Sequence, residues 1–488
     1  MAKDYVCVVD RGTTNVKAVL FDMDGRESFT ASVPGQIPVV LKPGWFEQDM
    51  HEIWNTAVKA VRQVTAWLSD GDRITGVSVT GQGSGVYITD KDGNPVRQGI
   101  TSLDTRADEI IQELGEEGIL DWWYSQAHRK LGKESPLAHL LWLKKYEPEK
   151  YEKSSHILFS KDWLKYCLTG EYSTDLTDAY PNAMIGQDEK TYFYEGLDRL
   201  GIGEKKDALP PLIPAHEIAG YVTAKAAAET GLPEGIPVLS GAHDMMASCM
   251  GTGRAGCDYL LCTIGSWGGN YMVTPERREN ISSSPHIVEG TYLTVYMDGN
   301  SGAVFDRMLR MHYSRPGEAL NMRDAYRMAE AQARNAKYKD LIFLPYLFEA
   351  LDEGNAGGGL YGLKNWHTGD DIMLAIYEGI VMHHYERVET KLVDAPKAET
   401  LYLGGGGAGS SLFAQLFADM FNRPVQIPDC DELAARGAAL AALAGLGVKK
   451  DIRDALIPVS VKKTYCPDPE NHKAMMEKLE IYKSLLKR

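Results

Sequence analysis

The chain opens with a strand, a polar turn and a second strand, which residues 5–21 spell as YVCVVDRGTTNVKAVLF. The apolar runs Tyr5–Val9 and Val16–Phe21 are rich in β-branched residues, as buried strands are. Between them stands an unusually polar turn, Asp10-Arg11-Gly12-Thr13-Thr14. Glycine lets the backbone approach an anion closely, and successive N–H groups with two hydroxyls can hold phosphate oxygens. The turn therefore fits a phosphate site, and an ordinary polar β-turn explains this pentapeptide equally well.

A carboxylate at the end of such a strand can bind Mg²⁺ directly or through water, and Asp10 has that position. The same order of strand, turn and strand returns at Tyr259–Ile264, Gly265-Ser266 and Gly269–Val273. One Gly-Ser turn is weak evidence, but a second copy of the pattern indicates a duplicated architecture. We therefore place a domain boundary near residue 245, with domains at 1–245 and 246–488.

Length, charge and cysteine usage limit the class of protein. A chain of 488 residues exceeds what one hydrophobic core usually spans, which favours two domains. The formal charge of −15 opposes nonspecific binding to nucleic acid or to an anionic membrane surface. Seven scattered cysteines without a CxxC pair are typical of reduced thiols. With no apolar stretch long enough for a bilayer, we expect a soluble, cytoplasmic protein.

A glycine run follows a later strand. Leu401–Leu403 leads into Gly404–Gly407, and a helix is predicted at Ser411–Phe421. This order brings backbone against a flat or charged ligand near a helix N-terminus. The run has neither the Lys-Ser/Thr ending of a P-loop nor a GxGxxG pattern, so neither a P-loop nor a dinucleotide fold is supported.

Asp244 follows a buried strand at Ile236–Ser240. Open α/β sheets place functional groups at this edge, but Asp244 would serve equally as the N-cap of a helix at Met245–Met250. Both interpretations stay open on the residues alone. We interpret His243, and the adjacent His383 and His384, as structural, because neighbouring helical residues point about 100° apart and do not chelate together.

Taken in order, these segments resemble the FGGY family of carbohydrate kinases over nearly the whole chain. No single motif is specific, and the resemblance depends on their coincidence in one order. The motifs are Asp10-x-Gly12-Thr13-Thr14-x-x-Lys17, Gly44–Asp49, Gly81-Gln82, Asp104-x-Arg106, Gly241-x-x-Asp244, Gly265-Ser266, Tyr377-Glu378-Gly379, Gly405-Gly406-Gly407-Ala408 and Gly437-Ala438-Ala439.

The resemblance implies two ribonuclease H-like (actin-like ATPase) α/β domains with a cleft between them, sugar held mainly by the first and ATP by the second. It implies that Asp244 is the general base and contacts the substrate, and that Asp10 lies near Mg²⁺. It assigns the two phosphate turns to Gly12, Thr13, Thr14, Gly265 and Ser266. It assigns adenosine contacts to Gly405, Gly406 and Ser410, and the sugar pocket to Gln82, Asp104 and Arg106.

The implied activity is ATP-dependent phosphorylation of a hydroxyl on a small sugar or polyol. After Gln82, common xylulose kinases have Met-His and glycerol kinases have Arg-Glu, whereas this chain has Gly83-Ser84. Together with Trp267 after the second turn, this looks similar to the L-xylulose kinase branch. We predict a ketopentose such as L-xylulose or D-xylulose, with a keto-sugar acid, an erythritol-like tetritol or glycerol as alternatives.

Two rival functions use the same architecture. A catalytically silent actin-like nucleotide-binding sensor would keep the phosphate turns without the base, but Asp244 is present. An actin-like chaperone ATPase would need a peptide-binding domain, and no segment is left to build one. A homodimer is possible, and we expect neither nucleic acid nor membrane as a partner.

Overall fold

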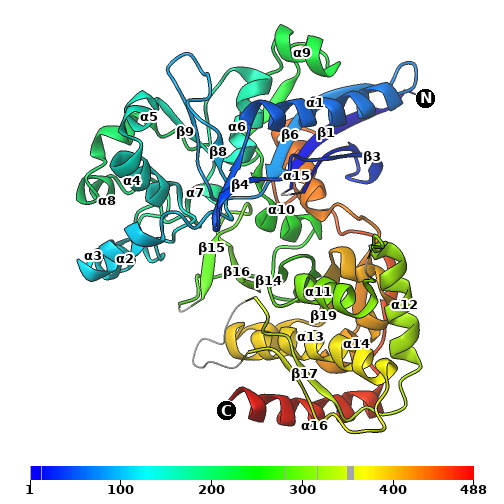
Figure 1. Cartoon of the computed structure of the whole chain (residues 1–488). Coiled ribbons are helices and arrows are strands. Elements are labelled where there is room, and N and C mark those ends of the chain that lie inside the picture. Colours follow the sequence, from blue (N-terminus) through cyan, green and yellow to red (C-terminus); the bar gives the residue numbers. More distant parts are fainter. Residues whose placement is uncertain (1, 13, 280, 316, 349–356, 488) are drawn as a thin grey trace. The chain divides into compact units, whose positions relative to one another are not determined.

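The computed structural model describes residues 2–12, 14–279, 281–315, 317–348 and 357–487, and Thr13 lies outside them. The chain divides into two compact α/β units, each assembled from three segments (Figure 1). The first unit comprises Met1–Ala255, Ser284–Tyr292 and Glu432–Pro458, and the second comprises Gly256–Ser283, Leu293–Asp431 and Val459–Arg488. The linear division near residue 245 stays a prediction about the functional domains.

The first unit is built on a seven-stranded mixed sheet in the order β10-β11-β6-β1-β2-β3, with β12 also paired to β6. Its strands are β1 (Asp4–Arg11), β2 (Asn15–Asp22), β3 (Glu27–Pro34), β6 (Arg73–Gly81), β10 (Ile218–Tyr221), β11 (Pro237–Leu239) and β12 (Ala242–His243). The hairpin β1–β2 and its extension to β3 are antiparallel, whereas β6 runs parallel to β1.

The pairing register of β1, β6 and β12 brings three segments that are distant in the sequence to one edge of this sheet. Arg11 pairs with Gly81 in the parallel β1–β6 ladder, and His243 pairs with the same Gly81 in the parallel β12–β6 ladder. Because carboxyl ends of parallel strands meet at one edge, the residues that follow them are neighbours. The predicted positions Asp10, Gln82 and Asp244 therefore lie at, or one residue from, this shared edge.

Two helices cover the sheet core of the first unit. α1 (Met50–Trp67) begins at the N-cap Asp49, whose side chain accepts from two backbone N–H groups, and it buries one face against the strands. α6 (Ser160–Thr169) packs into the same core through Trp163 and Leu164. In both helices apolar residues recur at helical spacing and form the face that packs on this core.

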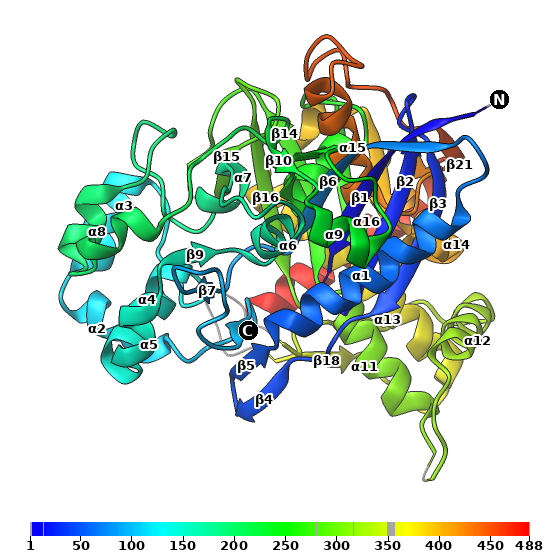
Figure 2. The same ribbon diagram turned by 90° about the horizontal axis from the view of Figure 1, so that it is seen from above.

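A helical region with its own core belongs to the first unit. It gathers around Trp123 and lies to one side of the β1–β3 strands in two views (Figures 1 and 2). The region contains α2 (Asp108–Glu116), α3 (Ile119–Ala127), α4 (Pro136–Tyr146), α5 (Pro148–Lys153) and α8 (Tyr194–Arg199). Smaller elements complete the unit: β4 (Val39–Lys42), β5 (Trp45–Gln48), β7 (Tyr87–Thr89), β8 (Gly99–Ile100), β9 (His156–Leu158), α7 (Leu176–Ala179) and α9 (Ala224–Thr230).

Two further helices of the first unit pack directly against each other. α10 (Asp244–Gly251) and α15 (Leu433–Gly445) pack so tightly that a Cβ on Gly437 would stand 1.8 Å from the Ala247 carbonyl oxygen. Glycine is therefore required at this crossing. α15 is separated from β1 by more than 400 residues of sequence, and no local pattern predicts its return to the first unit.

The second unit has a seven-stranded sheet in the order β15-β16-β14-β13-β19-β20-β21. Its strands are β13 (Tyr259–Ile264), β14 (Gly268–Thr274), β15 (Ser282–Pro285), β16 (Tyr292–Asp298), β19 (Thr400–Gly404), β20 (Val425–Pro428) and β21 (Val461–Tyr465). The antiparallel hairpin β13–β14 and the parallel neighbour β19 repeat the arrangement of β1, β2 and β6. The predicted second strand–turn–strand segment is confirmed.

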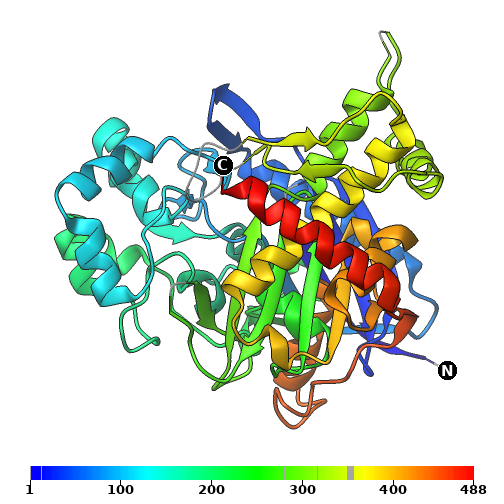
Figure 3. The same cartoon turned by 90° about the horizontal axis from the view of Figure 1, so that it is seen from below.

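Helices cover this second sheet, and Figure 3 shows α16, in red, running beside α13 and α14. They are α11 (Gly302–Tyr313), α12 (Met322–Arg334), α13 (Gly369–Lys391), α14 (Ser411–Phe421) and α16 (Pro469–Leu486), while β17 (Ile342–Leu344) pairs with β18 (Gly359–Tyr361). A buried ion pair between Lys478 and Glu378 joins α16 to α13. Among the described helices, none combines the length and apolar character needed to cross a bilayer.

Candidate active site

Asp10 lies inside β1 and not in the turn, because β1 continues to Arg11 and pairs Asp10 with Lys17. The turn itself is shorter than predicted. Burial raises the pKa of Asp10 to about 7, and the carboxylates of Asp244 and Glu432 act in the same direction, against Lys17 and Arg11. A carboxyl group with this environment is held among negative charges that a cation would relieve.

Lys17 and Glu432 form an ion pair beside Asp10. The Lys17 ammonium lies 2.7 Å from both carboxylate oxygens of Glu432, which directly precedes α15. Lys17 is about one-third exposed and Glu432 is mostly buried. No local pattern marks Glu432 as part of the site, because its partner is more than 400 positions away.

Asp244 is the first residue of α10, and the residue that caps this helix is His243. The Asp244 side chain is 36% exposed, whereas the His243 side chain is 8% exposed. Asp244 Oδ1 lies 3.0 Å from His243 Nδ1. The alternative in which Asp244 is the N-cap is therefore wrong, and its carboxylate is left accessible at the sheet edge.

A cluster of buried charges lies behind His243. Lys161 Nζ is 2.8 Å from Asp162, 2.6 Å from Asp175 and 3.0 Å from Asp178. Lys165 lies 3.1 Å from Asp162, and all five side chains have at most 1% exposure. Burial raises the pKa of Asp178 to about 6, although Lys161 opposes the shift. Charges this deeply buried are tolerated because each one has partners of opposite sign.

The three residues predicted to line the sugar pocket differ in where they lie and in what they contact. Gln82 directly follows β6, its N–H donates to the Arg11 carbonyl, and its side chain is buried at the shared edge. Asp104 and Arg106 bind each other through two hydrogen bonds of 2.9 and 2.8 Å, and neither side chain is exposed. Their direct contact with a sugar stays a prediction, and the geometry gives them a packing role.

Aromatic rings and a second carboxylate complete the surroundings of Arg106. The guanidinium donates to Glu47 at 2.8 Å and lies 4.4 Å from the ring centre of Trp45 and 5.0 Å from that of Trp142. A cation stacked between two rings and paired with two carboxylates is held in one position. This network fastens the helical region to the segment that contains β5.

In the second unit, Gly265 and Ser266 form the tight turn between β13 and β14, as predicted. Ser266 accepts a backbone hydrogen bond from Ala303, and a Cβ on Gly302 would lie 2.0 Å from the Gly265 carbonyl oxygen. Trp267, next in the turn, is 46% exposed. The backbone on both sides is therefore close-packed while the turn itself presents a large aromatic surface.

The glycine run after β19 also has the predicted form. Gly405 has φ of +76°, and a Cβ there would stand 2.6 Å from the Ile264 carbonyl oxygen, whereas Gly406 faces open space. Ser410 is the N-cap of α14, because its Oγ accepts from the Phe413 N–H and donates to Glu330 at 2.8 Å. The hydroxyl of Ser410 thus has a structural task, and its contact with adenosine stays a prediction.

The histidine pair on α13 is structural, which agrees with our interpretation. His383 Nε2 lies 2.8 Å from Asp298, and His384 bonds Asn270 at 2.8 Å and Ser301 at 3.0 Å. Burial lowers the pKa of His384 to about 3. Among the described residues, no group of three His, Cys, Asp or Glu side chains is arranged to hold a metal ion.

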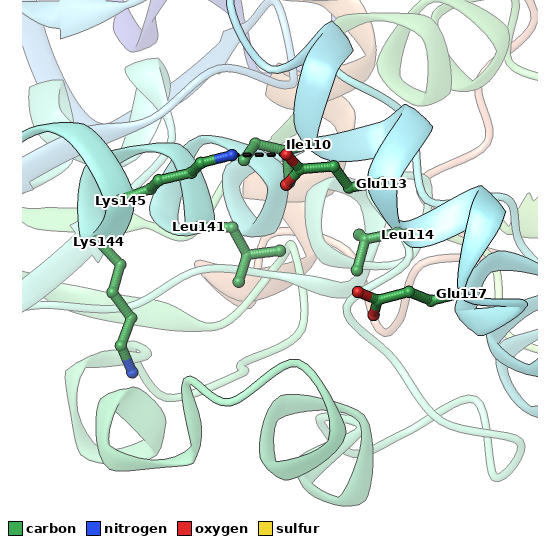
Figure 4. A pocket seen from close by; sticks show the side chains of 7 residues that line it. All are labelled: Ile110, Glu113, Leu114, Glu117, Leu141, Lys144 and Lys145. Carbon is green, nitrogen blue, oxygen red and sulfur yellow. Dashed lines mark hydrogen bonds and ion pairs between the residues drawn. The ribbon is translucent and has the colours of Figure 1, made fainter.

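A surface hollow of about 250 Å³ between α2 and α4 has no part in this site (Figure 4). Its floor is apolar, with Ile110, Leu114 and Leu141, and its rim is charged. Lys145 is already paired with Glu113 at 2.6 Å, and Lys144 with Glu204 at 2.7 Å. The lysines therefore leave little free positive charge for an anion.

The two sheets, each with a hairpin next to a parallel strand, define an actin-like ATPase fold, and solved kinases share it. A xylulose kinase from Rhodospirillum rubrum superposes with a TM-score of 0.86 at 25% identity, covering 99% of this chain and 98% of that one. Family models of the FGGY carbohydrate kinases match residues 5–251 with the N-terminal domain and 260–446 with the C-terminal domain. The chain belongs to the FGGY family of carbohydrate kinases.

Two relatives of the chain have names that state their activity. The chain is 30% identical to the L-xylulose/3-keto-L-gulonate kinase of Escherichia coli (strain K12), over 99% of this chain and 96% of that protein. It is 27% identical to a xylulose kinase of Staphylococcus epidermidis (strain RP62A), over 100% and 97% of the two chains. The family predicted from the sequence is confirmed, and the chain is a carbohydrate kinase.

Proposed function

We propose that this kinase transfers the γ-phosphoryl group of ATP to a hydroxyl of a ketopentose such as L-xylulose or D-xylulose. The observation that carries the proposal is Asp244, a partly exposed carboxylate at the edge shared by β1, β6 and β12. It stands on a helix terminus that buried partners hold in place, and not on a mobile loop. Such a group is suited to accept the proton of a substrate hydroxyl.

The reaction follows from this role. As the substrate O–H proton passes to Asp244, the oxygen attacks the γ-phosphorus and a new P–O bond forms. The bond between the γ-phosphorus and the bridging oxygen breaks, and ADP leaves with that electron pair. Little covalent chemistry falls to the protein, so positioning and charge stabilisation carry the catalysis. Gly12 and Thr14 in the first unit, with Gly265 and Ser266 in the second, are the proposed phosphate contacts.

Asp10 suits Mg²⁺. Magnesium prefers oxygen ligands and usually takes one or two carboxylates with phosphate oxygens and waters, so a larger cluster of side chains is not required. Neighbouring carboxylates contribute to the raised pKa of Asp10, and a divalent cation would relieve that repulsion. When bound, Mg²⁺ offsets the charge of the phosphates. Asp10 would hold it directly or through water.

The substrate assignment rests on the turn after Gln82 and on named relatives. A Cβ on Gly83 would lie 2.3 Å from the His243 ring, so the space beside Gly83 is filled by an imidazole and is not open. Ser84 donates to Asn182 at 2.8 Å. The first relative acts, by its name, on L-xylulose and on 3-keto-L-gulonate, which supports a ketopentose or a keto-sugar acid over glycerol or a tetritol. A cytoplasmic location and a homodimer stay predictions.

The decisive experiment is Asp244→Asn. An amide cannot take the hydroxyl proton, so we expect kcat to fall on the order of 10²–10⁴-fold, with unchanged melting temperature and ATP affinity. Asp468→Asn is the matched control, because Asp468 is an exposed N-cap on α16 and asparagine caps equally well. Sugar-dependent ADP release should be measured with L-xylulose, D-xylulose, glycerol and erythritol. Near-normal turnover by Asp244→Asn would remove Asp244 from the mechanism.

A further inference from the structure

His243 and Gly83 are fitted to each other. His243 ends β12 opposite Gly81 of β6, and its side chain is almost fully buried. A Cβ on Gly83 would stand 2.3 Å from both Cδ2 and Nε2 of the ring and 2.9 Å from Asp178 Oδ1. No side chain fits into such a space unless the ring moves. Glycine at residue 83 therefore allows the imidazole to occupy its present position.

The backbone of His243 is anchored as well. Its N–H donates to the Thr177 hydroxyl at 2.8 Å, and that hydroxyl donates in turn to Asp175, the N-cap of α7. The Asp175 carboxylate is also bound by Lys161. The imidazole thus extends from a chain of buried hydrogen bonds, and its position does not depend on a flexible loop.

The ring lies close to several negative charges. Asp244 Oδ1 is 3.0 Å from Nδ1, and Asp178 Oδ1 and the Cδ2–Nε2 edge of the ring lie 2.9 and 2.3 Å from the place that a Gly83 Cβ would take. The buried cluster behind it has three carboxylates, Asp162, Asp175 and Asp178, against the two ammonium groups of Lys161 and Lys165. A positive imidazolium balances the remaining negative charge. Burial by itself lowers the pKa of His243, but Asp244, Asp178 and Asp175 outweigh burial and raise it.

The protonation state of His243 Nδ1 decides which of its two neighbours it binds. Nδ1 lies 3.1 Å from the Met245 N–H and 3.0 Å from the Asp244 carboxylate. A nitrogen that accepts from the amide cannot at the same time donate to the carboxylate. His243 keeps the N-cap position of α10 in either state, and the surplus of carboxylates favours the protonated ring, in which Nδ1–H donates to Asp244 in place of accepting from the Met245 N–H.

We propose that His243 is a positioning residue for phosphoryl transfer, holding the Asp244 carboxylate in the orientation that faces the substrate hydroxyl, and that Gly83 is required because the ring needs its space. The inference rests on the proposed role of Asp244 as base. It assigns a function to a histidine that we interpret, on the sequence alone, as structural. Misplacing a reacting group by about 1 Å costs up to about 10²-fold in rate, which sets the size of the expected effect.

The test is a double-mutant cycle on Gly83→Ala and His243→Ala. Its substrates are ATP and whichever of L-xylulose, D-xylulose, glycerol and erythritol the wild type uses best. We expect each single variant to lower kcat about 10- to 100-fold while the KM for ATP stays within about twofold. Without the ring, the 2.3 Å clash of a residue-83 methyl group is gone and only the 2.9 Å contact with Asp178 Oδ1 remains, so Gly83→Ala should cause a much smaller further loss in the His243→Ala background. Gly186→Ala is the matched control, because its nearest neighbours would lie at an ordinary 3.9 Å.

Each other outcome overturns the inference. A loss from Gly83→Ala that persists in full without the ring would show that another neighbour of residue 83, such as Asp178 or the substrate, and not His243, causes the loss. Full activity of His243→Ala would mean that the ring contributes only to packing and does not position Asp244. A crystal structure of Gly83→Ala supplies evidence independent of activity: we expect a displaced ring and a rotated Asp244, and an unmoved pair would refute the argument. If Asp244→Asn is fully active, the proposed function fails; if only His243→Ala is fully active, this inference alone fails.

Discussion

Asp10→Asn should stabilise the folded protein above neutral pH, although it removes the proposed Mg²⁺ contact. The pKa of Asp10 rises from 3.8 to about 7 in the folded state, chiefly through burial and also through Asp244 and Glu432. Between these two values the native state binds a proton that the unfolded chain has released. The free energy of unfolding therefore decreases as pH rises through this window. Asparagine has no charge to bury, so the variant escapes this loss.

The magnitude follows from the size of the shift. One pKa unit corresponds to about 1.4 kcal/mol, so a shift of about three units sets an upper limit of about 4 kcal/mol. Because the side chain of Asp10 keeps some contact with solvent, we expect a gain of about 1–3 kcal/mol at pH 8. At pH 4 and below, where wild-type Asp10 is neutral in the folded state, the variant should gain almost nothing.

The assay is urea denaturation of both proteins from pH 4 to pH 8.5, without and with Mg²⁺. The stability difference should grow with pH through the window, and Mg²⁺ should raise the stability of the wild type at pH 8 more than that of Asp10→Asn. Asp24→Asn, at a turn where the side chain is 66% exposed, is the control and should show a flat difference. A difference for Asp10→Asn that does not change with pH would refute the reasoning.

Two further predictions concern packing in the first unit. Arg106→Leu should cost about 3–5 kcal/mol of unfolding free energy, because Asp104 would be left as a buried charge without its cation and Glu47 would keep only Arg97, and thermal and urea denaturation measure this loss. Gly437→Ala should cost about 1–3 kcal/mol, because its Cβ would stand 1.8 Å from the Ala247 carbonyl and force α10 and α15 apart, and the same denaturation measures it.

Both predictions have controls in the same unit. Arg26→Leu removes an exposed pair with Asp24 and should change stability by less than about 1 kcal/mol. Gly115→Ala, inside α2, places its Cβ 3.6 Å from Leu120 and should be neutral or stabilising. A loss from Arg106→Leu no larger than that from Arg26→Leu, or from Gly437→Ala no larger than that from Gly115→Ala, would contradict the respective prediction.

The elements that sequence predicted well are those with local signals. The β1–β2 and β13–β14 hairpins follow from short apolar runs around polar or glycine turns, and α1 follows from helical spacing after a capping Asp49. These patterns depend on neighbours within about twenty residues. The edge on which Asp10 and Asp244 meet could be expected too, because functional groups collect at the carboxyl ends of parallel strands.

What the sequence could not predict depends on pairs far apart in the chain. Nothing near Glu432 indicates that it binds Lys17, and nothing near Gly83 indicates that a histidine 160 residues later fills its side-chain space. The mutual burial of Asp104 and Arg106 was equally hidden, because an Asp-x-Arg spacing is compatible with either a ligand site or an internal ion pair. Long-range pairing selects between these outcomes only after the sheet has formed.

The distribution of charge agrees with the proposal that turns bind the phosphates. In the first unit, three cations near the acidic edge already have partners: Lys17 binds Glu432, Lys161 binds the carboxylates of the buried cluster, and the buried Arg11 donates to the Gly12 carbonyl and to Gln48. With Asp10 and Asp244 also at that edge, a polyphosphate arriving alone would meet repulsion. Attraction must therefore come from backbone N–H groups and from a cation that arrives with the nucleotide. In the proposed site, glycine-rich turns next to strand ends would supply the first and Asp10 would hold the second, which would allow an acidic chain to bind a nucleotide.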